Sequence, residues 1–155
     1  MKSFRFTLQP LLVIRERQER EAMEAYARVL AEQQRLMTSL YEVERELGTA
    51  YGDSRRRLLD GAAVTHILQQ QLYCAHLEER RKAAAAEVAS AGERVKKAVQ
   101  TMMIARQQRE VVEKFRANQR TVYDRELSME EQKMLDELAG RQREPALSWK
   151  PSDHD

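Results

Sequence analysis

The sequence is poor in the residues that stabilise small secreted domains and compact cores. Its 155 residues include one cysteine, Cys74, and aromatic residues make up only 6% of the chain. A single cysteine excludes an internal disulfide and favours a reducing compartment. The apolar residues are spread too thinly to fill a compact core, although the length suits one domain.

Long apolar runs are also lacking. The run from Leu11 to Ile14 is four residues long before the sequence turns charged. A secretory signal has roughly 7–15 apolar residues, and a membrane span has about 18 or more. We therefore expect a cytoplasmic protein with no transmembrane segment.

The chain has no large excess of charge of either sign. It contains 27 basic and 25 acidic residues, which gives a formal net charge of +2. Proteins that bind nucleic acid through bulk charge are more basic than this, so we expect no nucleic-acid partner. We interpret the triplet Arg55–Arg57 as a solvated loop, with phosphate or lipid headgroups as alternative ligands.

Groups for catalysis or metal binding are scarce. The histidines are His66, His76 and His154, and the first two are ten residues apart. That spacing is too long for one metal on one helical face, and Cys74 lies on a different face from His76. A glycine-rich phosphate loop is absent. We therefore expect a non-enzymatic protein without a metal or a cofactor.

Helical sequence with a regular apolar period is abundant. In two stretches, apolar residues and a few polar ones recur in alternating steps of three and four residues, which is typical of a left-handed supercoil with a partner helix. We call the residues at these positions, which would face the partner helix, a seam. We predict an all-α protein that forms a long antiparallel two-helix coiled-coil hairpin with unequal arms. The first seam is Leu8, Leu12, Arg15, Glu19, Ala22, Tyr26, Val29, Gln33, Leu36, Leu40, Val43, Leu47 and Ala50. The second seam is Ala63, Ile67, Gln70, Cys74, Leu77, Arg81, Ala84, Val88, Ala91, Val95, Ala98, Met102, Ala105, Arg109 and Val112.

Proline and glycine positions set the expected boundaries. Pro10 suits a first helical turn, so helix 1 should occupy about residues 8–50. A cluster of glycines predicts the chain reversal at about 51–62, with a possible short helical turn at Ser54–Leu59. Helix 2 should occupy about 63–139 and complete a single domain over 1–140. The glycines of the expected reversal are Gly48, Gly52 and Gly61.

The C-terminal residues 141–155 are predicted to be a disordered tail that follows Gly140. Trp149 in this tail is either incidental or part of a short docking motif.

Pairing the two seams about this reversal places Ala50 near Ala63 and Leu8 near Ala105. Helix 2 then extends past helix 1 by about 30–35 residues. An apolar stripe without an intramolecular partner needs either another molecule or a folded-back N-terminal arm carrying Phe4 and Phe6. The apolar residues of this overhang are Phe115, Val122, Tyr123, Leu127, Met129 and Leu138.

Two stretches resemble FliJ-type flagellar export proteins. The first is Phe4-x-Phe6-x-Leu8-x-x-Leu11-Leu12-x-x-Arg15. The second combines Val112-Glu113-Lys114, Tyr123-Asp124-x-Glu126 and the run Glu130-Glu131-Gln132-Lys133-x-Leu135-Asp136-Glu137-Leu138-Ala139. The order of residues in this last run is not required for helix formation, so it is the more specific part of the resemblance.

The resemblance implies an antiparallel coiled coil similar to the central stalk of rotary ATPases. The end bearing both termini would bind a hexameric export ATPase, and the region near the hairpin would meet the cytoplasmic ring of the membrane export gate. Export chaperones are further possible partners. The gate-binding positions fall on Tyr73, Leu77, Arg80 and Ala84, where the side-chain type departs from the family at the last two. The ATPase-binding positions fall on Phe4, Phe6, Leu8, Leu12, Arg15, Phe115, Tyr123, Glu131, Gln132, Lys133, Asp136 and Glu137.

From this resemblance we expect a coiled-coil stalk of a flagellar type III export apparatus, cytoplasmic and peripherally associated with the inner membrane through that apparatus. The alternatives are an export or escort chaperone, the stalk of a virulence-type secretion system, and a self-associating structural coiled coil.

Overall fold

The computed structural model describes residues 3–142 and contains two helices. Helix α1 spans Gln9–Leu59 and helix α2 spans Val64–Gln142, with 51 and 79 residues respectively. The described residues include no strand. The predicted all-α hairpin with unequal arms is therefore confirmed.

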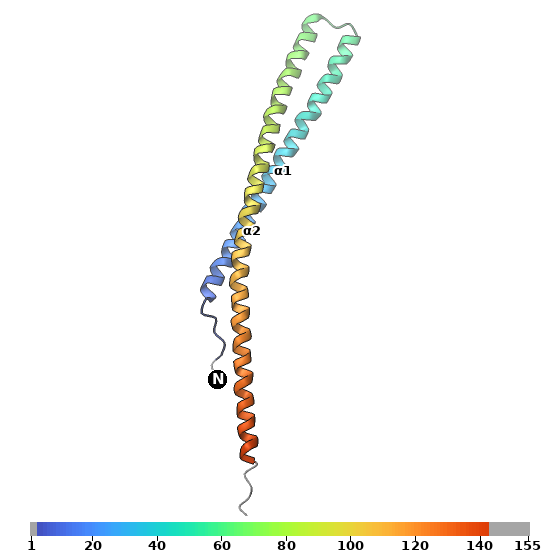
Figure 1. Ribbon diagram of the computed structural model, residues 1–155. Helices are drawn as coiled ribbons and strands as arrows, with labels where there is room; N and C mark the ends of the chain where they lie inside the picture. Colours follow the sequence, from blue (N-terminus) through green and yellow to red (C-terminus); the bar gives the residue numbers. More distant parts are fainter. Residues whose placement is uncertain (1–2, 143–155) are drawn as a thin grey trace, which may run out of the picture. The chain divides into compact units, whose positions relative to one another are not determined.

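The two helices contribute to two compact units. The hairpin unit comprises residues 13–109, and the described part of the terminal unit comprises residues 3–12 and 110–142. Within the hairpin unit, α1 and α2 run antiparallel from a short turn, drawn in green tones in Figure 1. The sequence led us to expect one domain over 1–140, whereas the structure groups these residues into two units.

The turn between the helices is built around Gly61. Its φ is +72°, a left-handed conformation that only glycine adopts at little cost. The Ala62 amide donates to the Arg57 carbonyl oxygen at 3.0 Å, and the Gly61 amide donates to the Leu58 carbonyl oxygen at 3.4 Å. This pair of bonds is a Schellman motif, which satisfies carbonyl groups at a helix end and stops the helix.

The predicted reversal at about 51–62 begins too early. Helix α1 continues through Gly48 and Gly52 to Leu59, because a glycine inside a helix costs only about 1 kcal/mol and does not by itself end it. Similarly, α2 continues past Gly140 to Gln142. The predicted tail from residue 143 onward, with Trp149, lies outside the described residues.

The later turn also shifts the pairing of the two seams. Ala50 packs with Leu47, Cys74 and Leu77 in a buried cluster, rather than near Ala63. The Gln70 side-chain amide donates to the Ala50 carbonyl oxygen at 3.0 Å. The predicted register is therefore wrong, although the predicted seam positions are the ones that the hairpin buries. The buried seam residues of the hairpin unit are Ala22, Val43, Leu47, Ala50, Cys74, Leu77, Ala91 and Ala105.

Polar residues on or next to the seams pair with each other across the hairpin. Glu19 forms an ion pair with Arg109, and their side chains are only 17% and 19% exposed. The Arg15 guanidinium donates to the Gln108 side-chain oxygen at 2.7 Å. Such pairs satisfy polar groups that would otherwise be costly at a seam, and polar seam positions help to specify register.

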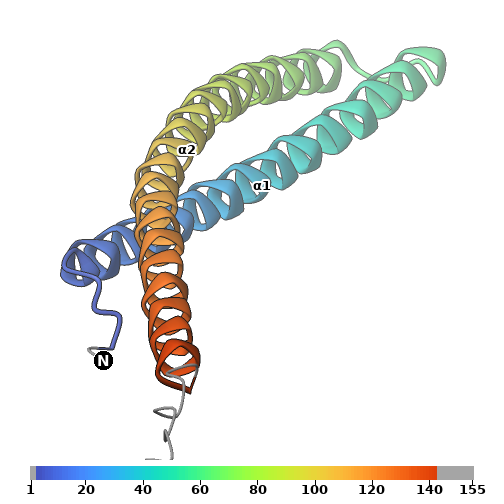
Figure 2. The ribbon, with the colours of Figure 1, turned by 60° about the horizontal axis from the view of Figure 1, so that its bottom comes forward.

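The core of the terminal unit forms where the N-terminal arm, residues 3–8, packs on α2. Phe6, Leu12 and Val112 are buried together, with Phe4 and Leu11 packed against them. Figures 1 and 2 both draw the arm beside the orange part of α2. The structure shows the folded-back arm for the part of the overhang around Phe115 and Tyr123. Met129 and Leu138 further along α2 remain 60% and 55% exposed.

Candidate partner-binding surfaces

Aromatic side chains hold the arm on α2 in the terminal unit. The ring centroids of Phe4 and Tyr123 are 5.5 Å apart, and those of Phe6 and Phe115 are 6.2 Å apart. Both pairs are tilted, a favourable arrangement for aromatic rings. The Arg120 guanidinium lies 5.3 Å from the Phe4 ring centroid, within cation–π range.

A groove of about 480 Å³ runs between the arm and α2. Its walls include the rings of Phe4, Phe115 and Tyr123, and Val122 is 52% exposed. A second depression of about 390 Å³ lies on the other side of Phe4, next to Arg116 and Arg120. The arm thus shapes the apolar surface of α2 instead of covering it completely. The groove is lined by Ser3, Phe4, Arg5, Phe115, Asn118, Gln119, Val122, Tyr123 and Glu126.

Ten of the twelve predicted ATPase-binding residues fall into three groups, and Leu8 and Arg15 stand apart. Phe4, Phe115 and Tyr123 line the groove, while Phe6 of the arm and Leu12 of α1 are buried. Leu8 is 38% exposed. Arg15 belongs to the hairpin unit, where it also donates to the Gln18 side chain at 3.0 Å. The third group is exposed on the last turns of α2 and comprises Glu131, Gln132, Lys133, Asp136 and Glu137.

The predicted gate-binding residues have different surroundings. Tyr73 is 48% exposed, whereas Leu77 is 0% exposed and packs inside the hairpin. Arg80 pairs with Glu46 of α1 at 3.6 Å, and both side chains are about half exposed. Ala84 is partly buried. Only Tyr73 and Arg80 of the four therefore present substantial side-chain surface to a partner.

A depression of about 250 Å³ beside Tyr73 was not predicted from the sequence. The Tyr73 side chain and the α1 residues Glu46, Thr49 and Asp53 line it, with Ala50 and Arg45. These α1 residues could not be found from the sequence, because the predicted register placed another part of α2 beside them.

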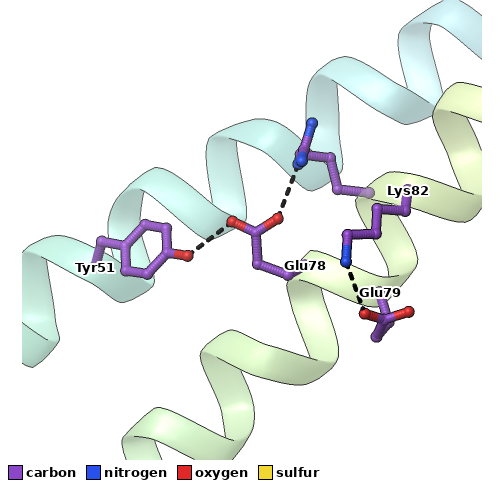
Figure 3. A network of polar contacts seen from close by, with 5 residues as sticks. Tyr51, Glu78, Glu79 and Lys82 are labelled. Carbon is purple, nitrogen blue, oxygen red and sulfur yellow. Dashed lines mark hydrogen bonds and ion pairs between the residues drawn. The ribbon is translucent and has the colours of Figure 1, made fainter.

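A polar network crosses the hairpin close to Leu77. The Tyr51 hydroxyl of α1 donates to the Glu78 carboxylate of α2 at 2.7 Å, and the Arg81 guanidinium donates to its second oxygen at 3.1 Å (Figure 3). The bond from Tyr51, and then the bond from Arg81, lower the pKa of Glu78 below its usual value. The same bond to Glu78 raises the pKa of Tyr51. Figure 3 also shows the pair formed by the next residue, Glu79, with Lys82 three residues further along α2.

The described residues, 3–142, contain neither a metal-binding cluster of side chains nor a membrane-spanning helix. No group of three or more His, Cys, Asp or Glu side chains in this range is arranged to hold a metal ion. Neither described helix has a stretch long and apolar enough to cross a membrane.

Comparison with known proteins identifies one family. No curated protein and no solved structure matches the chain. The model of the family described as flagellar FliJ protein matches residues 4–144, which include both helices, and all of the arm and the groove-lining residues except Ser3. The chain therefore belongs to the flagellar FliJ protein family and is a component of flagellar export.

Proposed function

We propose that this chain is the coiled-coil stalk of the flagellar export apparatus, and that it links the hexameric export ATPase to the membrane export gate. The groove between the arm and α2 is the observation that carries this proposal. It combines an apolar wall with a polar rim, the composition expected of a protein-binding surface. Association with the inner membrane would follow from these partners.

The terminal unit is the proposed ATPase-binding part. Phe115 and Val122 are 45% and 52% exposed at the groove, so a partner side chain that enters it would remove apolar surface from water. Further along α2, the exposed charges from Glu131 to Glu137 would add electrostatic complementarity, which favours correct orientation more than affinity. The stalk would act by steric contact, favouring assembly of the ATPase ring and transmitting its asymmetry.

The hairpin unit is the proposed gate-binding part. Tyr73 and Arg80 offer accessible side chains there, and exposed aromatic and arginine residues are enriched where binding energy concentrates. Leu77 would support this surface from beneath, because it is fully buried. Ala84 would contribute through hairpin packing.

Stimulation of the isolated export ATPase tests the groove. We expect Val122→Ser to weaken ATPase binding about tenfold, because it places a hydroxyl on the apolar wall without disturbing the buried Phe6–Leu12–Val112 core. The matched control is Met37→Ser in the hairpin unit, since Met37 is also 52% exposed. Unchanged stimulation by the Val122 variant would place the ATPase contact elsewhere.

A second candidate function is self-association as a structural coiled coil. Met134, Leu135 and Leu138 favour it, because they are 63%, 62% and 55% exposed on the last turns of α2. Sedimentation at increasing protein concentration separates the two candidates: a constant monomer mass supports the stalk, and open-ended growth supports the scaffold. An escort role would appear as a heavier complex when an export chaperone is added to the same sedimentation experiment.

A further inference from the structure

The hairpin tip, residues 55–68, exposes large apolar side chains that the hairpin does not pack. Leu58 and Leu59 at the end of α1 are 56% and 80% exposed, and Val64 and Leu68 at the start of α2 are 71% and 53% exposed. The buried cluster of the hairpin nearest this turn is formed by Leu47, Ala50, Cys74 and Leu77. The helices therefore extend beyond that cluster with apolar residues pointing to solvent.

The same segment has a net positive charge. Residues 55–68 contain three arginines and one acidic residue, Asp60, so their formal charge of +2 equals that of the whole sequence. Arg56 is held in an ion pair with Asp53. Arg55 and Arg57 are exposed and form no ion pair within the described part of the chain.

One arginine and two leucines lie on the same side of α1 at this tip. Arg55, Leu58 and Leu59 are related by spacings of three and four residues, so they occupy one side of the last turns of α1. Val64 and Leu68 are likewise one turn apart at the start of α2. Figures 1 and 2 both show the turn that joins these segments as the end of the hairpin unit.

Helix electrostatics explains only part of this composition. Arg56 and Arg57 lie in the last turn of α1, where positive charge is favourable next to the helix C-terminus. That effect gives no reason for exposed leucines to follow the arginines. Contact with a lipid bilayer would account for both residue types. Leucines would enter the boundary between headgroups and acyl chains, and arginines would bind headgroup phosphates.

We propose that the hairpin tip docks on the surface of a bilayer that contains anionic lipids. Leu58, Leu59 and Val64 enter the boundary between headgroups and acyl chains, and Arg55 and Arg57 bind lipid phosphates. With only this modest net charge, binding is reversible and weakens as salt screens the attraction. The proposal is independent of the proposed ATPase contact, which involves the terminal unit.

Co-sedimentation of the full chain with lipid vesicles tests the proposal. We expect binding to vesicles of equal parts phosphatidylcholine and phosphatidylglycerol, and little binding to phosphatidylcholine alone. Arg55→Glu with Arg57→Glu, and separately Leu58→Ser with Leu59→Ser, should each reduce binding about tenfold or more. The control is Arg20→Glu with Arg28→Glu, the same charge change at exposed positions of α1 away from the tip.

Position-specific labelling supplies the second measurement. An environment-sensitive fluorophore on Leu59→Cys, in a Cys74→Ala background checked for helicity, should shift to shorter wavelength on the anionic vesicles. Absence of vesicle binding, or equal loss in the Arg20/Arg28 control, would overturn the proposal. Tip variants that lose binding to a protein partner but still bind vesicles would also overturn the proposal. In that case the tip would bind an acidic surface of another protein.

Discussion

At the scale of single residues, Tyr73 and Leu77 show that neighbouring positions on one helix can have different roles: one is exposed and the other is buried in the hairpin. They are one turn apart on α2, yet Tyr73 is 48% exposed and Leu77 is 0% exposed. Leu77 packs against Leu47, Ala50 and Cys74. A substitution at Leu77 therefore acts on the hairpin first, and on any partner only through the hairpin.

We expect Leu77→Ala to lower the free energy of unfolding of the hairpin by about 2–5 kcal/mol, because it removes a fully buried side chain and leaves a cavity. Urea denaturation followed by circular dichroism measures this change. Leu72→Ala is the matched control, since Leu72 is 71% exposed and its truncation should change stability by only about 0.5 kcal/mol. Equal stability of the two variants would contradict the buried role of Leu77.

At the scale of secondary-structure elements, the glycines near the turn have opposite roles. Gly61 has a φ of +72° and ends α1, whereas Gly52 lies inside α1. A Cβ atom added at either position meets no atom within 4 Å. Backbone conformation, rather than space, therefore decides the effect of substitution at both sites.

We expect Gly61→Ala to destabilise the hairpin by about 1–2 kcal/mol, the cost of a left-handed conformation for a residue with a Cβ atom. Gly52→Ala should instead stabilise it by about 0.5–1 kcal/mol, because alanine is the better helix former. Thermal unfolding of the two variants and of the unaltered chain measures whether each substitution raises or lowers stability. A stabilising Gly61→Ala would show that the turn does not depend on the Schellman geometry.

The same glycines explain how far the sequence predicted this part of the fold. The seams could be predicted because an apolar period is written in the sequence, and burial at Val43, Leu47 and Cys74 follows it. The register could not, because it depends on which glycine ends α1, and that is settled by the hydrogen bonds around Gly61. Because the predicted register was wrong, contacts between the two helices, such as the Tyr51–Glu78 hydrogen bond, could not be predicted either.

At the scale of the whole molecule, the two compact units carry separate candidate surfaces. In the terminal unit, a folded-back arm carrying Phe4 and Phe6 was one of two alternatives from the sequence, and the aromatic pairs with Tyr123 and Phe115 show what the arm packs against. In the hairpin unit, Tyr73 lines a depression with α1 residues. Each surface is formed by residues of one unit alone, so we expect a substitution in one to leave the side-chain contacts of the other unchanged.

Because the two surfaces are separate, we predict that two single variants each weaken binding to a different partner. Tyr73→Ala should weaken binding to the cytoplasmic ring of the export gate while leaving ATPase binding unchanged, and Val122→Ser should do the reverse. Binding of each variant to each isolated partner gives four measurements, and flagellar motility should fall in both variants because a stalk must hold both partners. Loss of both partners in either variant would mean that one surface serves both, since neither substitution removes a buried side chain.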